Sequence, residues 1–110
     1  MSLYLIRGKM TREAIKGLIA KPEDRTAALR SVLEAVGAKL LHLGYSVSTG
    51  EIITLCEAPS PMALWSHSAM VFSGGVVDGG SVEELMTPAQ FAESMRGAGS
   101  LAAKYRPPGK

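Results

Sequence analysis

The chain has 110 residues, of which 46% are apolar and 20% charged, and its formal charge at neutral pH is +2. A chain of this length forms one domain, which buries about 65% of the surface that its unfolded form exposes. So small a charge argues against a nucleic acid or an anionic membrane as a partner, and the composition is typical of a soluble globular domain.

The cysteine content and the hydropathy pattern restrict the compartment. Cys56 is the only cysteine, which excludes an intramolecular disulfide, and its place in an apolar run is typical of a reducing compartment. No N-terminal segment has the pattern of a signal peptide, and no apolar run reaches the roughly 18 residues that cross a bilayer. We therefore expect a cytoplasmic protein that has no membrane partner.

The first third of the chain reads as one strand and two helices. Residues 3–7 are large and mostly apolar and stop at Gly8, as a buried strand does. Thr11 is placed to cap a helix that begins near Arg12. Pro22 interrupts that helix, and its position predicts the first residue of a second helix, which Gly37 ends.

A β-hairpin follows. Residues 40–47 and 52–58 are apolar runs that flank the short polar link Ser48-Thr49-Gly50-Glu51, so they predict two antiparallel strands joined by a turn. Both alternating faces of residues 52–58 carry large apolar side chains. A strand with this pattern is covered on both sides.

Helix caps mark the last third of the chain. Ser60 and Pro61 predict the start of a helix that runs to Phe72, before two glycines. A strand begins at residues 76–77, while residues 81–86 fit either its continuation or a helical turn. Thr87-Pro88-Ala89-Gln90 is a capping box that opens a further helix. We expect one domain over residues 1–96 and a flexible tail over 97–110.

The order of these elements predicts an α+β fold. Strand, helix, strand, strand, helix, strand is the ferredoxin-like βαββαβ pattern, a four-stranded antiparallel sheet with helices on one face. Its central strands would be residues 3–7 and 52–58, which are apolar on both faces. A second copy packed on the open sheet face would cover them, forming a homodimer with a dimeric α/β barrel. Burial of roughly 500 Å² per subunit would contribute about 12 kcal/mol before the costs of association.

Several short motifs resemble those of the GYD-domain family. They are Lys21-Pro22-Glu23-Asp24-Arg25, Gly37-Ala38-Lys39-Leu40, Gly50-Glu51, Glu57-Ala58-Pro59, and Met86-Thr87-Pro88 with Phe91. The resemblance spans about residues 3–96. It implies a bacterial protein of the dimeric α/β-barrel superfamily, which includes small cofactor-free monooxygenases, lactone isomerases and heme-handling enzymes. Ile52 and Ile53 replace the Tyr and Asp that commonly follow Gly-Glu in that family.

Two histidines are the candidate catalytic residues. His42 lies within the strand at residues 40–47 and His67 within the helix that follows Pro61. An imidazole that faces a bound ligand can donate or accept a proton near neutral pH. The alternatives are an exposed edge-strand position for His42 and packing on a helix surface or along a cleft for His67.

The candidate ligand-binding residues are Tyr4, Arg7, Tyr45 and Trp65, a sparse polar and aromatic set beside apolar strands. Arg7 has an alternative role as the partner of Glu57 in an ion pair between the central strands. No short ligand spacing predicts a metal site, and we expect no cofactor. The sequence therefore favours a cleft that binds a small, largely apolar molecule; the alternative is a non-enzymatic module for protein assembly.

Overall fold

The computed structural model describes residues 1–110 and has the predicted α+β architecture. Its elements are β1 (Ser2–Met10), α1 (Arg12–Ala20), α2 (Thr26–Ala35), β2 (Lys39–Tyr45), β3 (Ile52–Ala58), α3 (Pro61–Ser73), β4 (Val77–Leu85) and α4 (Pro88–Gly99). The four strands form one antiparallel sheet in the order β2-β3-β1-β4. The central strands β1 and β3 are the two that the sequence places there.

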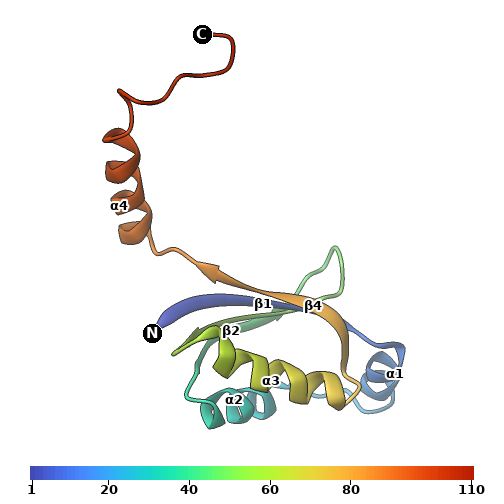
Figure 1. Cartoon of the computed structure of the whole chain (residues 1–110). Coiled ribbons are helices and arrows are strands. Elements are labelled where there is room, and N and C mark those ends of the chain that lie inside the picture. Colours follow the sequence, from blue (N-terminus) through green and yellow to red (C-terminus); the bar gives the residue numbers. More distant parts are fainter.

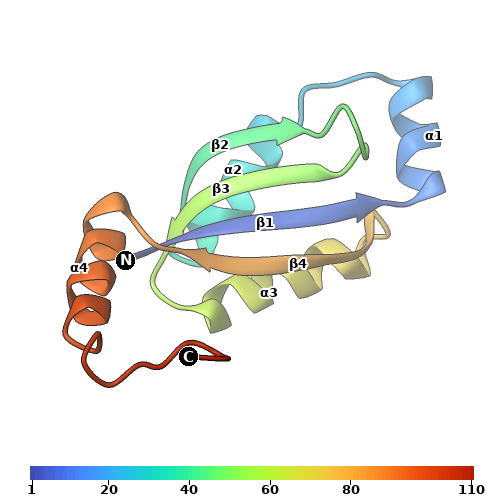
Figure 2. The same ribbon diagram turned by 90° about the horizontal axis from the view of Figure 1, so that it is seen from above.

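Helices α2 and α3 cover one face of this sheet, and α1 lies at its end (Figure 1). Seen from the other side, the sheet carries no helix over its strands (Figure 2). The fold is thus a two-layer arrangement with one open sheet face, as the ferredoxin-like pattern predicts. No helix is both long and apolar enough to cross a membrane.

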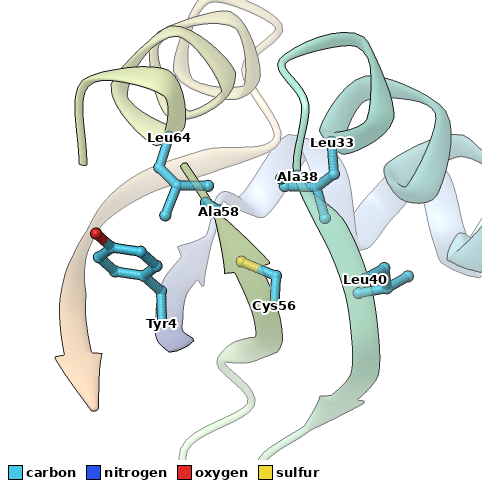
Figure 3. Close-up of a cluster of buried hydrophobic side chains, with 7 residues drawn as sticks. All are labelled: Tyr4, Leu33, Ala38, Leu40, Cys56, Ala58 and Leu64. Carbon is cyan, nitrogen blue, oxygen red and sulfur yellow. The ribbon is translucent and has the colours of Figure 1, made fainter. Parts of the chain in front are cut away.

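The core lies between the sheet and the α2–α3 layer (Figure 3). Its buried side chains come from two helices, three strands and the turn before β2: Tyr4, Leu33, Ala38, Leu40, Cys56, Ala58 and Leu64. Tyr4 and Cys56 are paired positions of β1 and β3, and Leu64 of α3 packs over them. Leu64 thus ties α3, which runs along the β4 side of the sheet (Figure 2), to the core.

Local capping explains where three of the helices begin. The Thr11 side chain accepts a hydrogen bond from the Ala14 amide, and the Ser60 side chain accepts one from the Ala63 amide. Thr87 and Gln90 form both hydrogen bonds of a capping box. Each cap satisfies amide groups that the first helical turn leaves without a partner, so these predictions from the sequence are confirmed.

The predicted start of the second helix at Pro22 is wrong. The helix begins at Thr26, because Asp24 accepts hydrogen bonds from the Thr26 amide and hydroxyl at 2.9 and 2.6 Å. An Asx turn of this kind stabilises a short link in competition with the helix. The same two hydrogen bonds lower the pKa of Asp24, and the one from the Thr26 hydroxyl has the larger effect.

Residues 81–85 continue β4 instead of forming a helical turn. They pair in register with β1, from Leu85 opposite Leu3 to Gly80 opposite Gly8. Position 80 needs a glycine, because a Cβ atom there would collide with the Arg7 carbonyl oxygen. Gly80 is therefore what allows the close pairing of β4 with β1.

Candidate functional site

A large cleft lies on the helix-covered side of the sheet. It has a volume of about 980 Å³ and is lined mostly by apolar side chains from β1, β3, β4, α1, α2 and α3. That volume is at the upper end of what pockets for small molecules have. The cleft is present because α1, α2 and α3 bury few residues between them, namely Leu33, Leu64 and His67.

Three buried polar side chains line this apolar cleft. They are Tyr4 on β1, Thr54 on β3 and His67 on α3, with exposed fractions of 2%, 6% and 5%. Thr54 pairs with Ile6, so it lies one step along the sheet from the Tyr4–Cys56 pair, on the same face. The cleft therefore offers two hydroxyls from the sheet and one imidazole from the helix above it.

The backbone fixes where His67 sits. Leu64 packs over Tyr4 and Cys56, and His67 follows it by three residues, which places both side chains on the same face of α3. The helix rises about 4.5 Å over that interval. His67 therefore lines the cleft about one turn beyond Leu64 along α3.

His67 is a buried imidazole that burial keeps in its neutral form. Its Nδ1 atom is buried and makes no hydrogen bond. Burial lowers the pKa of His67 below its ordinary value of 6.5, because desolvation penalises the charged imidazolium. The ring is consequently neutral at pH 7, and a neutral imidazole keeps one nitrogen lone pair that can accept a proton.

The predicted aromatic residues lie along the same cleft but are more exposed. Trp65 on α3 and Tyr45 at the end of β2 line it, with exposed fractions of 64% and 45%. Amphipathic rings in such positions contact an apolar ligand while their polar atoms remain in water. Of the six predicted site residues, five line this one cleft, namely Tyr4, Arg7, Tyr45, Trp65 and His67.

His42 lies on the opposite side of the sheet. It is exposed and paired with Leu55, on the face away from the helices. The pairing of β2 with β3 shifts between Leu40 and His42, so Leu41 is an extra residue that turns His42 away from the core while Leu40 stays buried. A bulge of this kind cannot be read from simple alternation.

The side chain of Arg7 also belongs to the open face. Arg7 alternates with Tyr4, Ile6 and Gly8 along β1, although the residue also borders the cleft where its carbonyl oxygen passes Gly80. The alternative of an ion pair with Glu57 is wrong: Arg7 is opposite Ile53 and Glu57 is opposite Leu3. The ion pairs of the chain are Arg25–Glu23 and Arg96–Glu93. Glu57 lies four residues along β3 from the position opposite Arg7, which is too far for an ion pair.

The open sheet face has an apolar centre. Leu3, Leu5, Ile53 and Leu55 alternate with the core residues and are each only partly buried. Beside them a shallow hollow of about 300 Å³ is formed around His42 and Gly44 at the β2 edge. The expected two-sided apolarity of the central strands is thus confirmed.

The structure forms no cluster of three or more His, Cys, Asp and Glu residues that could hold a metal ion. Cys56 is fully buried in the core, and burial raises the pKa of its thiol, which makes it a poor nucleophile. Sequence reasoning missed Thr54 as a polar residue of the cleft. Its only signal was a hydroxyl two residues from Cys56 on the face that the helices cover.

Solved structures with a similar shape include the following two small proteins. Rv0793 from Mycobacterium tuberculosis is 15% identical, with a TM-score of 0.48, over 77% of this chain and 92% of its own. Atu4242 from Agrobacterium tumefaciens is 16% identical, also with a TM-score of 0.48, over 83% of this chain and 96% of its own. No protein-family model and no curated protein matches the chain.

Proposed function

We propose that the cleft between the helices and the sheet binds a small, largely apolar molecule that carries at least one hydroxyl or carbonyl group. The observation that carries the proposal is His67, a neutral imidazole with an unpartnered buried Nδ1 atom in an apolar cleft. A buried polar atom without a partner costs stability. A ligand that offers a hydrogen bond would recover part of that cost.

The proposed interaction is a hydrogen bond between the ligand and the neutral imidazole of His67, which has one donor and one acceptor nitrogen. Burial weakens the ring as a base, so a proton transferred to it from a ligand O–H group would leave an anionic oxygen for the Tyr4 and Thr54 hydroxyls of the cleft to stabilise. The Tyr4 and Thr54 hydroxyls line the same cleft and would orient the polar end of the ligand. Trp65 and Tyr45 would contact its apolar body at the entrance.

The proposal extends to the compartment, the oligomeric state and the family of the protein. We infer that the chain is a cytoplasmic homodimer related to the GYD-domain family, and that any catalysis is cofactor-free, as in the monooxygenases and isomerases of the dimeric α/β-barrel superfamily. The partly exposed Leu3, Leu5, Ile53 and Leu55 support the dimer, because apolar sheet faces of this kind are usually covered. Residues 1–96 would form the domain and 97–110 a tail, although α4 crosses this boundary and ends at Gly99.

The experiment is a thermal-shift screen with aromatic alcohols, phenols and lactones, followed by calorimetric titration of the compounds that stabilise the protein. His67→Leu should abolish binding of these compounds, whereas His42→Leu, on the other side of the sheet, should bind them with unchanged affinity. Equal binding by both variants would contradict the proposed role of His67. No stabilisation by any compound would contradict the small-molecule function and favour the alternative, a protein-assembly module.

A further inference from the structure

Helix α4 stands apart from the rest of the molecule. It follows β4 after the two-residue link Met86-Thr87 and lies beyond the end of the sheet, on the side opposite to α2 and α3 (Figures 1 and 2). None of its residues is buried. The radius of gyration is 18.3 Å, against about 13 Å for a compact chain of this length. The projecting helix is thus not packed as part of a compact monomer.

The sequence of α4 nevertheless specifies a helix with an apolar stripe. Thr87 and Gln90 close a complete capping box at its start. Phe91, Met95 and Ala98 share one side at helical spacing, while Glu93 and Arg96 form an ion pair on the opposite side. Phe91 and Met95 have exposed fractions of 51% and 49%. A 12-residue helix is marginal in water without a surface to pack on, so this stripe requires a covering surface.

We infer that the apolar stripe of α4 packs against the body of a second copy of this chain, and that the two copies exchange these helices reciprocally. A second copy placed on the open sheet face would lie on the side to which α4 projects. Two-fold symmetry would then give each α4 the same surface on the other copy. The single arrangement covers both unpartnered apolar surfaces, the sheet face and the helix stripe.

The area needed for a stable dimer supports this occupant. Stable interfaces bury about 800 Å² on each partner, which is more than one face of a small four-stranded sheet is expected to supply. A fully buried aromatic side chain contributes about 150 to 250 Å², and Phe91 and Met95 are each about half exposed, so their burial adds roughly 100 Å² each. The helix thus enlarges the interface that the sheet face begins.

The inference concerns a part of the molecule remote from His67. The cleft is lined by α1, α2 and α3 and by no residue of α4. Failure of the α4 inference would therefore leave the ligand proposal standing, and the reverse also holds.

The test combines two charged double variants with sedimentation equilibrium. Phe91→Glu with Met95→Glu places two charges on the stripe, and Ala89→Glu with Ser100→Glu places the same two charges on the opposite side. We expect the first pair to raise the dimer dissociation constant by a factor of ten or more, which is the effect of losing an important interface residue. The control pair should change it by less than about threefold. Because α4 has no buried residue, neither pair should unfold the body.

Photo-crosslinking identifies the surface that α4 touches. Benzoyl-phenylalanine at position 91, in a mixture of ¹⁵N-labelled and unlabelled chains, should give mixed-isotope crosslinks to peptides within residues 2–85 of the other copy. Crosslinks confined to the same chain, crosslinks only between the two α4 helices, or equal dimerisation of both charged double variants would each overturn the inference.

Discussion

Replacing His67 by leucine should make the protein more stable and remove its function. His67 is 5% exposed, and its Nδ1 atom has no hydrogen-bond partner. An unsatisfied buried polar atom costs about 1 to 3 kcal/mol, and this cost disappears when the side chain is replaced by an apolar one of similar size. Leucine also favours a helix interior by a few tenths of a kcal/mol over histidine.

The expected gain in the free energy of unfolding is about 1 to 2 kcal/mol, because part of the apolar contact of the imidazole ring is lost with it. For a domain of this size each kcal/mol raises the melting temperature by roughly 4 to 8 °C. Few buried residues offer such a gain, because natural cores are already well packed. A stabilising substitution that also abolishes ligand binding would mark His67 as a residue retained for function.

Urea unfolding followed by circular dichroism measures this difference, at one fixed protein concentration because subunit association adds to apparent stability. The midpoint should rise while the slope with urea is unchanged, which shows that the same surface is exposed on unfolding. His42→Leu is the matched control: this histidine is exposed on β2, so its replacement should change the free energy by no more than about 0.5 kcal/mol. A loss of 1 kcal/mol or more in His67→Leu would refute the account, since it would mean that the imidazole makes favourable contacts in the folded protein.

Three further predictions follow from buried or closely packed groups. Burial lowers the pKa of His67 below 6.5, so the unfolded chain binds the proton at a higher pH than the folded protein does, and the free energy of unfolding should fall as pH drops from about 6.5 to the lower native pKa. Urea titrations over pH 4 to 8 should show this pH dependence in the wild type and a weaker one in His67→Leu. Equal pH dependence in the two proteins would contradict the prediction. Gly80→Ala should lower the free energy of unfolding by roughly 2 kcal/mol or more, because the added Cβ collides with the Arg7 carbonyl oxygen. In the control Gly44→Ala, the added Cβ meets nothing within 4 Å, so the change should be neutral or slightly stabilising. Similar changes in melting temperature in both variants would count against the β1–β4 pairing. The Cys56 thiol, buried and with a raised pKa, should react with a disulfide reagent only as fast as the fold opens, and rapid reaction in native buffer would contradict its place in the core.

Much of the fold was predictable because its determinants are local. Thr11, Ser60 and the Thr87–Gln90 box are short-range signals that place helix starts independently of the remaining chain. The order of the elements identified β1 and β3 as the central strands. The open, apolar sheet face followed from their apolar pattern, since both parities of these strands carry leucine or isoleucine.

The candidate site was less predictable, because it depends on register and on tertiary packing. The extra residue at Leu41 in β2 turns His42 to the opposite face from Leu40, and nothing in the alternation of residues 40–46 reveals it. The distance between Arg7 and Glu57 depends on the β1–β3 register. The burial of His67 depends on how α3 packs against the sheet, which no local pattern in the helix sequence indicates.

Chemical-shift mapping with the most stabilising compound of the screen tests the central claim most directly. In ¹⁵N- and methyl-labelled protein, the account predicts saturable shifts at Ile6, Thr54 and His67, around the cleft, with His42 and Leu55 on the open face unaffected. Shifts confined to the open face, or no saturable shift in the cleft with any compound, would contradict the assignment of the cleft as a ligand-binding site.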